Sequence, residues 1–197
     1  MNLMTDYSGV CAVDTETSGL DARKCGTLSV AIVPLTNAFE PFPHYPVFVS
    51  DVRPDPGIVI EDKALQVNGF TPERMEAAPP RDETIKAFAD WHAGLADLTK
   101  IPLITPLAHN FAFDKSFLTQ WLDPNDMNTF FFYQHLDTMA MVNYYNFRSR
   151  IRGNKPVFFK TALTAVTKAL GLQHDDAHGA LGDAMATARL MRHFLTI

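Results

Sequence analysis

Residues 10–19 read Val10-Cys-Ala-Val-Asp-Thr-Glu-Thr-Ser-Gly19, an apolar run followed by two acids and a turn. The apolar run predicts a buried β-strand. Side chains alternate between the two faces of a strand, so Asp14 and Glu16 are expected on the same face. An isolated Asp-x-Glu is more often a solvated strand end. Two acids on one face also offer oxygen ligands to a hard cation.

The rest of the chain predicts a mixed sheet flanked by helices. Four more segments are expected as strands, at 27–33, 45–49, 103–108 and 130–133. Six segments are expected as helices, at 64–67, 83–98, 114–122, 139–145, 161–170 and 181–195. Strands in hairpin succession followed by alternating helices and strands indicate an α/β fold. We expect three antiparallel strands followed by parallel ones, within a single domain over residues 1–197.

Composition excludes several classes of protein. The 197 residues contain 17 Lys+Arg and 22 Asp+Glu, a formal charge of −5, which argues against coating nucleic acid by bulk attraction. Two cysteines are too few for a disulfide framework. We find no secretory signal and no apolar stretch near the ~18 residues of a membrane helix. A cytoplasmic protein that does not bind membranes is the expectation.

Two further acids and one histidine extend the pattern. Asp114 follows the fourth expected strand, where it either caps the first helical turn or joins the acids at the same edge of the sheet. Asp183 lies on an alanine-rich helix, where a buried carboxylate is costly unless a cation compensates its charge. His178 is expected in the loop before that helix, free to reach over the site.

Taken together, these residues resemble a known family. The motifs Asp14-x-Glu16, Asn110-x-x-Phe113-Asp114 and His178-x-x-x-x-Asp183 are similar to the signature of the DEDDh (DnaQ-like) 3′-to-5′ exonucleases. The resemblance covers residues 9–195 and implies a ribonuclease H-like fold. Relatives in that family include bacterial proofreading subunits, ribonuclease T and oligoribonuclease.

The resemblance also implies a site and a reaction. It makes His178 the general base, since histidine titrates near neutral pH. Two divalent ions, Mg²⁺ or Mn²⁺, would assist hydrolysis at the 3′ end of a single strand and release 5′-mononucleotides. The implied metal ligands are Asp14, Glu16, Asp114 and Asp183, and the implied substrate-binding residues are Thr17, Leu20, Asn110 and Phe113.

Substrate and assembly stay open at this level. DNA is favoured, and an RNA-directed exoribonuclease is the first alternative because no motif reports on the 2′-hydroxyl. An inactive nucleic-acid-binding module and a ribonuclease H-type endonuclease are further alternatives. The chain retains all four acids and the histidine of the family signature, which argues against an inactive binding module. The His178–Asp183 pair argues against a ribonuclease H-type endonuclease. A homodimer is compatible with the sequence.

A basic segment offers a path for the strand. Residues 138–174 contain no Asp or Glu and include six cations and several aromatic residues. Aromatic side chains beside cations can stack the bases of a single strand. The alternative is a solvated basic loop whose aromatic side chains turn inward. The cations are Arg148, Arg150, Arg152, Lys155, Lys160 and Lys168, and the aromatics are Tyr144, Tyr145, Phe147, Phe158 and Phe159.

Overall fold

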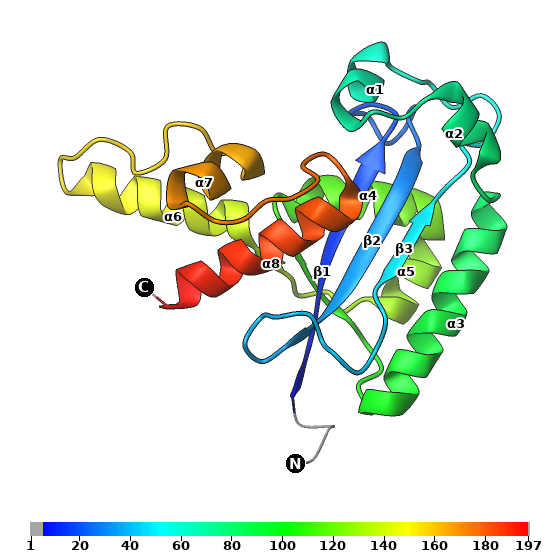
Figure 1. The fold of residues 1–197 in the computed structure, drawn as a ribbon, viewed down its shortest axis with the longest axis horizontal. Coiled ribbons are helices and arrows are strands. Elements are labelled where there is room, and N and C mark those ends of the chain that lie inside the picture. The colour runs from blue at the N-terminus through cyan, green and yellow to red at the C-terminus, as the bar shows by residue number, and fades with distance from the viewer. Residues whose placement is uncertain (1–5, 197) are drawn as a thin grey trace.

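A five-stranded sheet forms the centre of the computed structural model, which describes residues 6–196 (Figure 1). The strand order is β3-β2-β1-β4-β5. β1 pairs antiparallel with β2, β2 pairs antiparallel with β3, and β4 and β5 continue the sheet in parallel with β1. This confirms the predicted fold class. The strands are β1 Tyr7–Thr17, β2 Thr27–Thr36, β3 Phe48–Asp51, β4 Thr105–Ala108 and β5 Leu136–Asp137.

Helices cover both faces of the sheet. α8 crosses one face over β1 and β2, while α3, α4 and α5 pack against the other (Figure 1). None of the helices within residues 6–196 is long and apolar enough to cross a lipid bilayer. The helices are α1 Asp62–Asn68, α2 Pro72–Ala77, α3 Arg81–Thr99, α4 Phe111–Leu122, α5 Pro124–Phe130, α6 Thr138–Ile151, α7 Leu163–Leu170 and α8 Ala180–Thr196.

Strand alternation in β1 decides where its polar residues point. Val13 belongs to the apolar core shared with α3 and α4, and Ala12 belongs to the core under α8. Continuing the alternation, Asp14 and Glu16 lie on the α8 side and Thr15 lies on the α4 side. The predicted common face of the two acids is therefore the face that α8 covers.

Small residues bring α8 close to the sheet. Ala180, Ala184 and Ala188 are buried against β1 and β2. An alanine side chain adds only one carbon between helix and strand, so the backbones can approach closely. Asp183, beside this alanine face, is thereby carried to the C-terminal end of β1 near Asp14 and Glu16.

Two of the expected strands differ from the structure. The third strand is Phe48–Asp51 rather than 45–49. Pro46 lacks the N–H that a ladder needs, and the Tyr45 hydroxyl instead donates to the carbonyl of Trp91 at 2.6 Å. The prediction of a strand at 130–133 is wrong. Phe130 ends α5 and Phe131 makes only an isolated bridge to Ile104, because burial in the core beneath α3 holds these rings.

α6, the loop 152–162 and α7 form what we call the arm, which extends away from the sheet beside α8 (Figure 1). Its inner side is a separate apolar core with the C-terminal half of α8. Val142 of α6, Phe158 of the loop and Val166 of α7 contact that core together with Leu190 and Phe194. The arm is thus anchored to the same helix that carries Asp183.

Candidate active site

Three acids from two elements meet at the C-terminal end of β1. Carboxylate oxygens of Asp14 and Glu16 in β1 and of Asp183 in α8 all lie within 4.8 Å of one another. We call these three residues the acid cluster. Each side chain is partly buried, so solvent only partly screens the charges from one another.

Asp114 approaches from the opposite face of the sheet. It lies in the first turn of α4 and is only 3% exposed. Its Oδ1 accepts hydrogen bonds from the Thr15 backbone N–H at 3.1 Å and the Thr15 hydroxyl at 2.9 Å. Thr15 stands between Asp14 and Glu16 in the strand, so this bond ties Asp114 to the acid cluster without placing it among the three clustered oxygens.

Burial and crowding raise the pKa values of these acids. Burial followed by the charges of Asp114, Asp183 and Glu16 raises the pKa of Asp14 well above its usual range. Burial, then Asp183 and Asp114, raises the pKa of Glu16 to about 8. Burial raises the pKa of Asp114 to about 7 despite the Thr15 hydrogen bonds, which lower it.

The donor set fits a divalent cation. Converging carboxylates that resist ionisation need a positive charge to be ionised together, and hard oxygen ligands suit Mg²⁺ or Mn²⁺. Among residues 6–196, Arg74 is the cation whose charge lowers the pKa of Glu16, and that guanidinium is already bound to Asp51 at 2.7 Å. The site is therefore a candidate metal centre.

His178 lies in the loop before α8, as the sequence predicted. Its backbone has φ 70°, in the left-handed region, and its N–H donates to Asp183 Oδ1 at 3.2 Å. The side chain is exposed, and within residues 6–196 its ring has no hydrogen-bond partner. The ring is available to a substrate or a water molecule beside the acid cluster.

A second histidine, which the sequence did not single out for a role, contacts the acid cluster directly. His174 Nε2 lies 2.6 Å from Asp183 Oδ1, and its Nδ1 lies 3.2 Å from the Thr167 hydroxyl in α7. The nine-residue separation from Asp183 is not a helical or strand spacing, so the sequence carried no signal for this pair.

A cavity of about 320 Å³ opens beside the acid cluster. Its lining includes Glu16 of the cluster and three of the four predicted substrate-binding residues, Thr17, Leu20 and Phe113. Leu20 is 79% exposed, so its side chain presents open apolar surface at this cavity. Asn110 does not line this cavity: it precedes α4 with φ 76° and its N–H donates to Asp137.

α1 forms the opposite wall of the same cavity. Lys63, Val67 and Asn68 line it, and the Asn68 amide donates to the Thr17 carbonyl at 3.0 Å. The helix ends at Asn68 and is capped by Gly69, whose backbone has φ 68°, in the left-handed region. The lining of the cavity thus combines apolar side chains with one cation, Lys63, and the carboxylates of Glu16 and Glu61.

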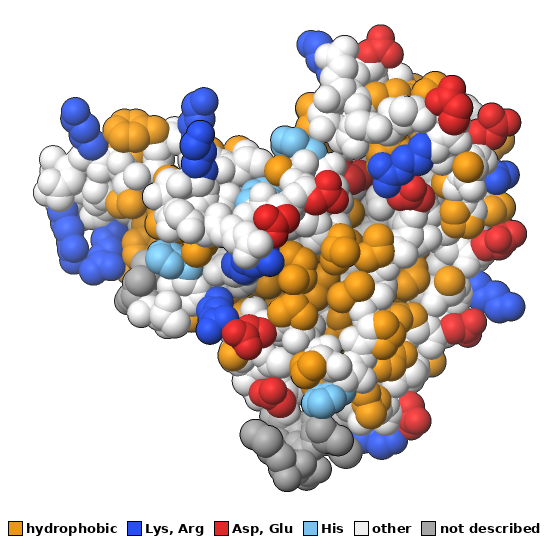
Figure 2. All heavy atoms as spheres, in the orientation of Figure 1, with side chains coloured by type: hydrophobic (Ala, Val, Ile, Leu, Met, Phe, Trp, Pro, Cys, Tyr) orange, Lys and Arg blue, Asp and Glu red, His pale blue; other side chains and the backbone are white. Residues whose placement is uncertain are grey.

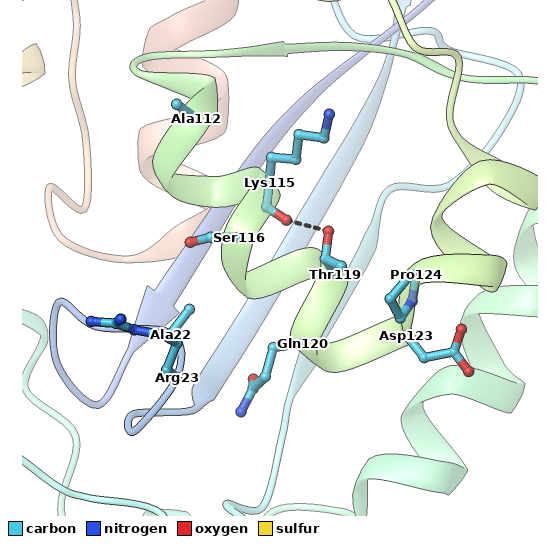
Figure 3. Close-up of a pocket in the computed structure, with 9 residues that line it drawn as sticks. All are labelled: Ala22, Arg23, Ala112, Lys115, Ser116, Thr119, Gln120, Asp123 and Pro124. Carbon is cyan, nitrogen blue, oxygen red and sulfur yellow. Dashed lines mark hydrogen bonds between the residues drawn. The ribbon is translucent and has the colours of Figure 1, made fainter.

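A larger cavity, of about 650 Å³, lies along the outer side of α4 (Figure 3). It is lined by Arg23, Lys115, Gln120 and neighbouring residues, and none of the acid cluster reaches it. Figure 3 shows the Thr119 hydroxyl donating to the Lys115 carbonyl within the helix, and Asp123 is the one acid among the lining residues. Size alone does not make it the site of chemistry.

Asp137 connects the helix that carries Asp114 to the arm. Its carboxylate accepts from the N–H groups of Met139 and Ala140 and so caps the start of α6. It also accepts from Asn110 at 3.0 Å and Phe111 at 3.1 Å, at the start of α4. One carboxylate therefore fixes the N-termini of two helices relative to each other.

The arm divides its aromatic residues between core and surface. Phe158 is buried, and the Tyr145 ring lies 5.2 Å from that of Phe194. Phe147 is 66% and Phe159 80% exposed, beside the basic residues of the arm. Figure 2 shows Lys and Arg side chains projecting from this region among exposed hydrophobic groups. Part of the aromatic set therefore turns inward, and the other part stays exposed on the arm.

Comparison with known proteins defines the class. An exonuclease family model matches residues 11–191, so this chain belongs to the exonuclease family that includes ribonuclease T-like domains. The chain is 28% identical to ribonuclease T of Baumannia cicadellinicola subsp. Homalodisca coagulata, over 90% of this chain and 79% of that protein. Family membership confirms the predicted exonuclease and its DnaQ-like class.

Solved structures carry the same fold. E. coli exonuclease I in complex with a dT13 oligonucleotide matches 92% of this chain with a TM-score of 0.64 and 20% identity. The nuclease domain of 3′hExo, a DEDDh family member bound to rAMP, matches 98% of this chain with a TM-score of 0.66 and 18% identity. This chain spans 39% of that exonuclease I chain and 92% of the 3′hExo domain.

Proposed function

We propose that this protein removes nucleotides from the 3′ end of single-stranded nucleic acid, and that Asp14, Glu16, Asp114 and Asp183 hold its divalent metal ions. The observation that carries the proposal is the acid cluster beside the cavity of about 320 Å³, which one of its members, Glu16, lines. A terminal nucleotide in that cavity would bring its phosphate to the acids. Bound metal ions would supply charge neutralisation at the phosphate and activation of water.

The chain's own residues divide the remaining work. Leu20 and Phe113 offer apolar surface to the terminal base. Thr17 lies beside the sugar of that nucleotide. His178 takes a proton from the attacking water. The new bond forms between that water oxygen and phosphorus, and the bond from phosphorus to the 3′ oxygen of the shortened strand breaks. The 3′ oxygen takes up a proton from solvent and His178 releases its proton to solvent, so the products are a 5′-mononucleotide and a strand with a new 3′-hydroxyl.

The arm is proposed to hold the strand upstream of the cut. Exposed Tyr144, Phe147 and Ile151 follow one another at helical spacing on α6, with Arg148 on the same side. Rings beside cations suit unpaired bases and their phosphates, whatever the base sequence. This local contact reconciles an acidic chain with a polyanionic substrate.

DNA is the first substrate we propose, and RNA is the second. The similarity to ribonuclease T favours testing RNA with equal care, and the two solved neighbours carry dT13 and rAMP. Discrimination between DNA and RNA depends on contacts to the 2′-hydroxyl of the sugar.

A time course on matched DNA and RNA strands, labelled at either end, tests the proposal. With Mg²⁺ or Mn²⁺ we expect a 5′-labelled strand to give a ladder that shortens from the 3′ end, and a 3′-labelled strand to release labelled mononucleotide at once. EDTA, a 3′-phosphate block or His178→Ala should stop release while the circular dichroism spectrum stays unchanged. A single internal cut, or full Mg²⁺-dependent activity in Asp14→Ala, would refute the proposal.

A further inference from the structure

Asp183 Oδ1 receives two hydrogen bonds from the loop that precedes α8. His174 Nε2 lies 2.6 Å away, and the His178 backbone N–H donates to the same oxygen at 3.2 Å. Among residues 6–196, no hydrogen bond is found to Asp183 Oδ2. One oxygen of this carboxylate is thus occupied by the loop, and the other is left for the acid cluster.

The His174 ring is itself held from behind by α7. Its Nδ1 lies 3.2 Å from the Thr167 hydroxyl, which also lies 2.9 Å from the Leu163 carbonyl. The hydroxyl either donates to Nδ1 or donates to Leu163 and accepts from Nδ1. In the first arrangement a neutral ring carries its hydrogen on Nε2 and donates it to the carboxylate, and in the second the ring donates from both nitrogens and is an imidazolium cation.

Burial makes this chain of contacts hard to replace with water. The His174 side chain is 8% exposed and the Asp183 side chain 16%. A partly buried carboxylate needs donors to stay ionised, and a ring fixed at both nitrogens cannot turn away. Carboxylates that bind metals are commonly oriented by such hydrogen-bonded partners.

We propose that His174 is a positioning residue that orients Asp183 for metal binding, with Thr167 of the arm fixing its ring. The inference rests on the proposed function in one respect, which is that the acid cluster binds divalent cations. It extends that function by connecting the metal centre to the arm through Thr167, His174 and Asp183, and it assigns the two nearby histidines different tasks.

Direct measurement of Mn²⁺ binding tests this proposal without substrate. The free Mn²⁺ signal in electron paramagnetic resonance gives the affinity of the full chain for the ion. We expect His174→Ala to weaken binding by about 10- to 100-fold. His174→Gln, whose amide can still donate, should recover much of that loss. Thr167→Val should weaken binding less, and Thr167→Ser should restore it. His44→Ala, an exposed histidine among prolines, is the matched control.

Kinetics then separate positioning from general damage. In His174→Ala we expect kcat to fall at low Mn²⁺ and recover at high Mn²⁺, with KM for the strand unchanged. Wild-type Mn²⁺ affinity in a folded His174→Ala protein would overturn the proposal, and so would an equal loss in His174→Ala and His174→Gln. A wild-type chain that binds Mn²⁺ but releases no nucleotide would refute the proposed function alone, because the Mn²⁺ comparison would still stand.

Discussion

Thr15 binds Asp114 through a single carboxylate oxygen on the face of the sheet opposite to the acid cluster. The Thr15 N–H and hydroxyl donate to Asp114 Oδ1 at 3.1 and 2.9 Å, although the residues are 99 positions apart. Strand alternation points Thr15 away from Asp14 and Glu16, so it can hold an acid on α4 while its neighbours face α8. Asp14 and Glu16 are therefore two candidate metal ligands, and Thr15 between them supports a third, Asp114.

Removing the hydroxyl of Thr15 tests that support. We expect Thr15→Val, which is nearly isosteric, to raise the pKa of Asp114 further and weaken Mn²⁺ binding by about tenfold or more. Thr15→Ser keeps the donor and should bind like the wild type. Isothermal titration with Mn²⁺ measures the difference. Equal affinity in the valine and serine variants would show that the backbone N–H alone suffices.

Without bound metal, the folded protein should become less stable as the pH rises. The folded-state pKa values of Glu16 and Asp114, about 8 and about 7, lie above the values of 4.5 and 3.8 for the free groups. The native state therefore binds more protons than the unfolded state across that window. These groups make the unfolding free energy fall as pH rises from about 4 to about 8.

Thermal unfolding in EDTA, compared with a Glu16→Gln variant, measures this effect. We expect the wild-type Tm to fall relative to the variant between about pH 5 and about pH 8.5. Divalent ions bind the deprotonated acids, so the rise in Tm on adding Mg²⁺ should be larger at the higher pH. A wild-type Tm that rises relative to the variant with pH would contradict the raised pKa of Glu16.

The contrast between acids and histidines shows what sequence can and cannot predict. Asp14 and Glu16 follow from a local rule, since a period of two fixes their common face. Asp114 follows from its position after a strand, and Asp183 from its position on an alanine-rich helix, where a buried carboxylate needs a compensating cation. His174 depends on how an irregular loop folds back on α8, and no local periodicity encodes that. The prediction of a strand at residues 130–133 was wrong for a related reason, because burial under α3 outweighed the strand propensity of these aromatic residues.

The exposed rings of the arm should matter for long strands and not for short ones. We expect Phe147→Ala to raise KM for a long single strand about tenfold, because the variant loses the stacking of one base. The kcat on a dinucleotide, which does not reach the arm, should stay unchanged. Tyr133→Ala removes a similarly exposed ring outside the arm and is the control. Steady-state kinetics against strand length provide the measurement. Equal effects on long and short substrates would place Phe147 outside the strand path.

Gly182 sets the conformation of the loop that carries both histidines. A Cβ at this position would overlap the carbonyl oxygens of Asp175 and Asp176, which are backbone atoms and cannot swing aside. Gly182→Ala must therefore displace the loop, and with it His174 and His178. We expect at least a tenfold loss of nucleotide release with the sheet intact.

Gly57→Ala separates this local effect from ordinary glycine strain. Gly57 has φ 88°, and beyond its chain neighbours no atom lies within 4 Å of the position that a Cβ would take. Alanine there costs backbone energy of about 1 kcal/mol without a clash. We expect Gly57→Ala to lower Tm slightly and retain activity, and Gly182→Ala to lose activity beyond any change in Tm. Hydrogen exchange of residues 174–179 should increase only in Gly182→Ala. Unchanged exchange and activity in that variant would show that the loop tolerates the added carbon.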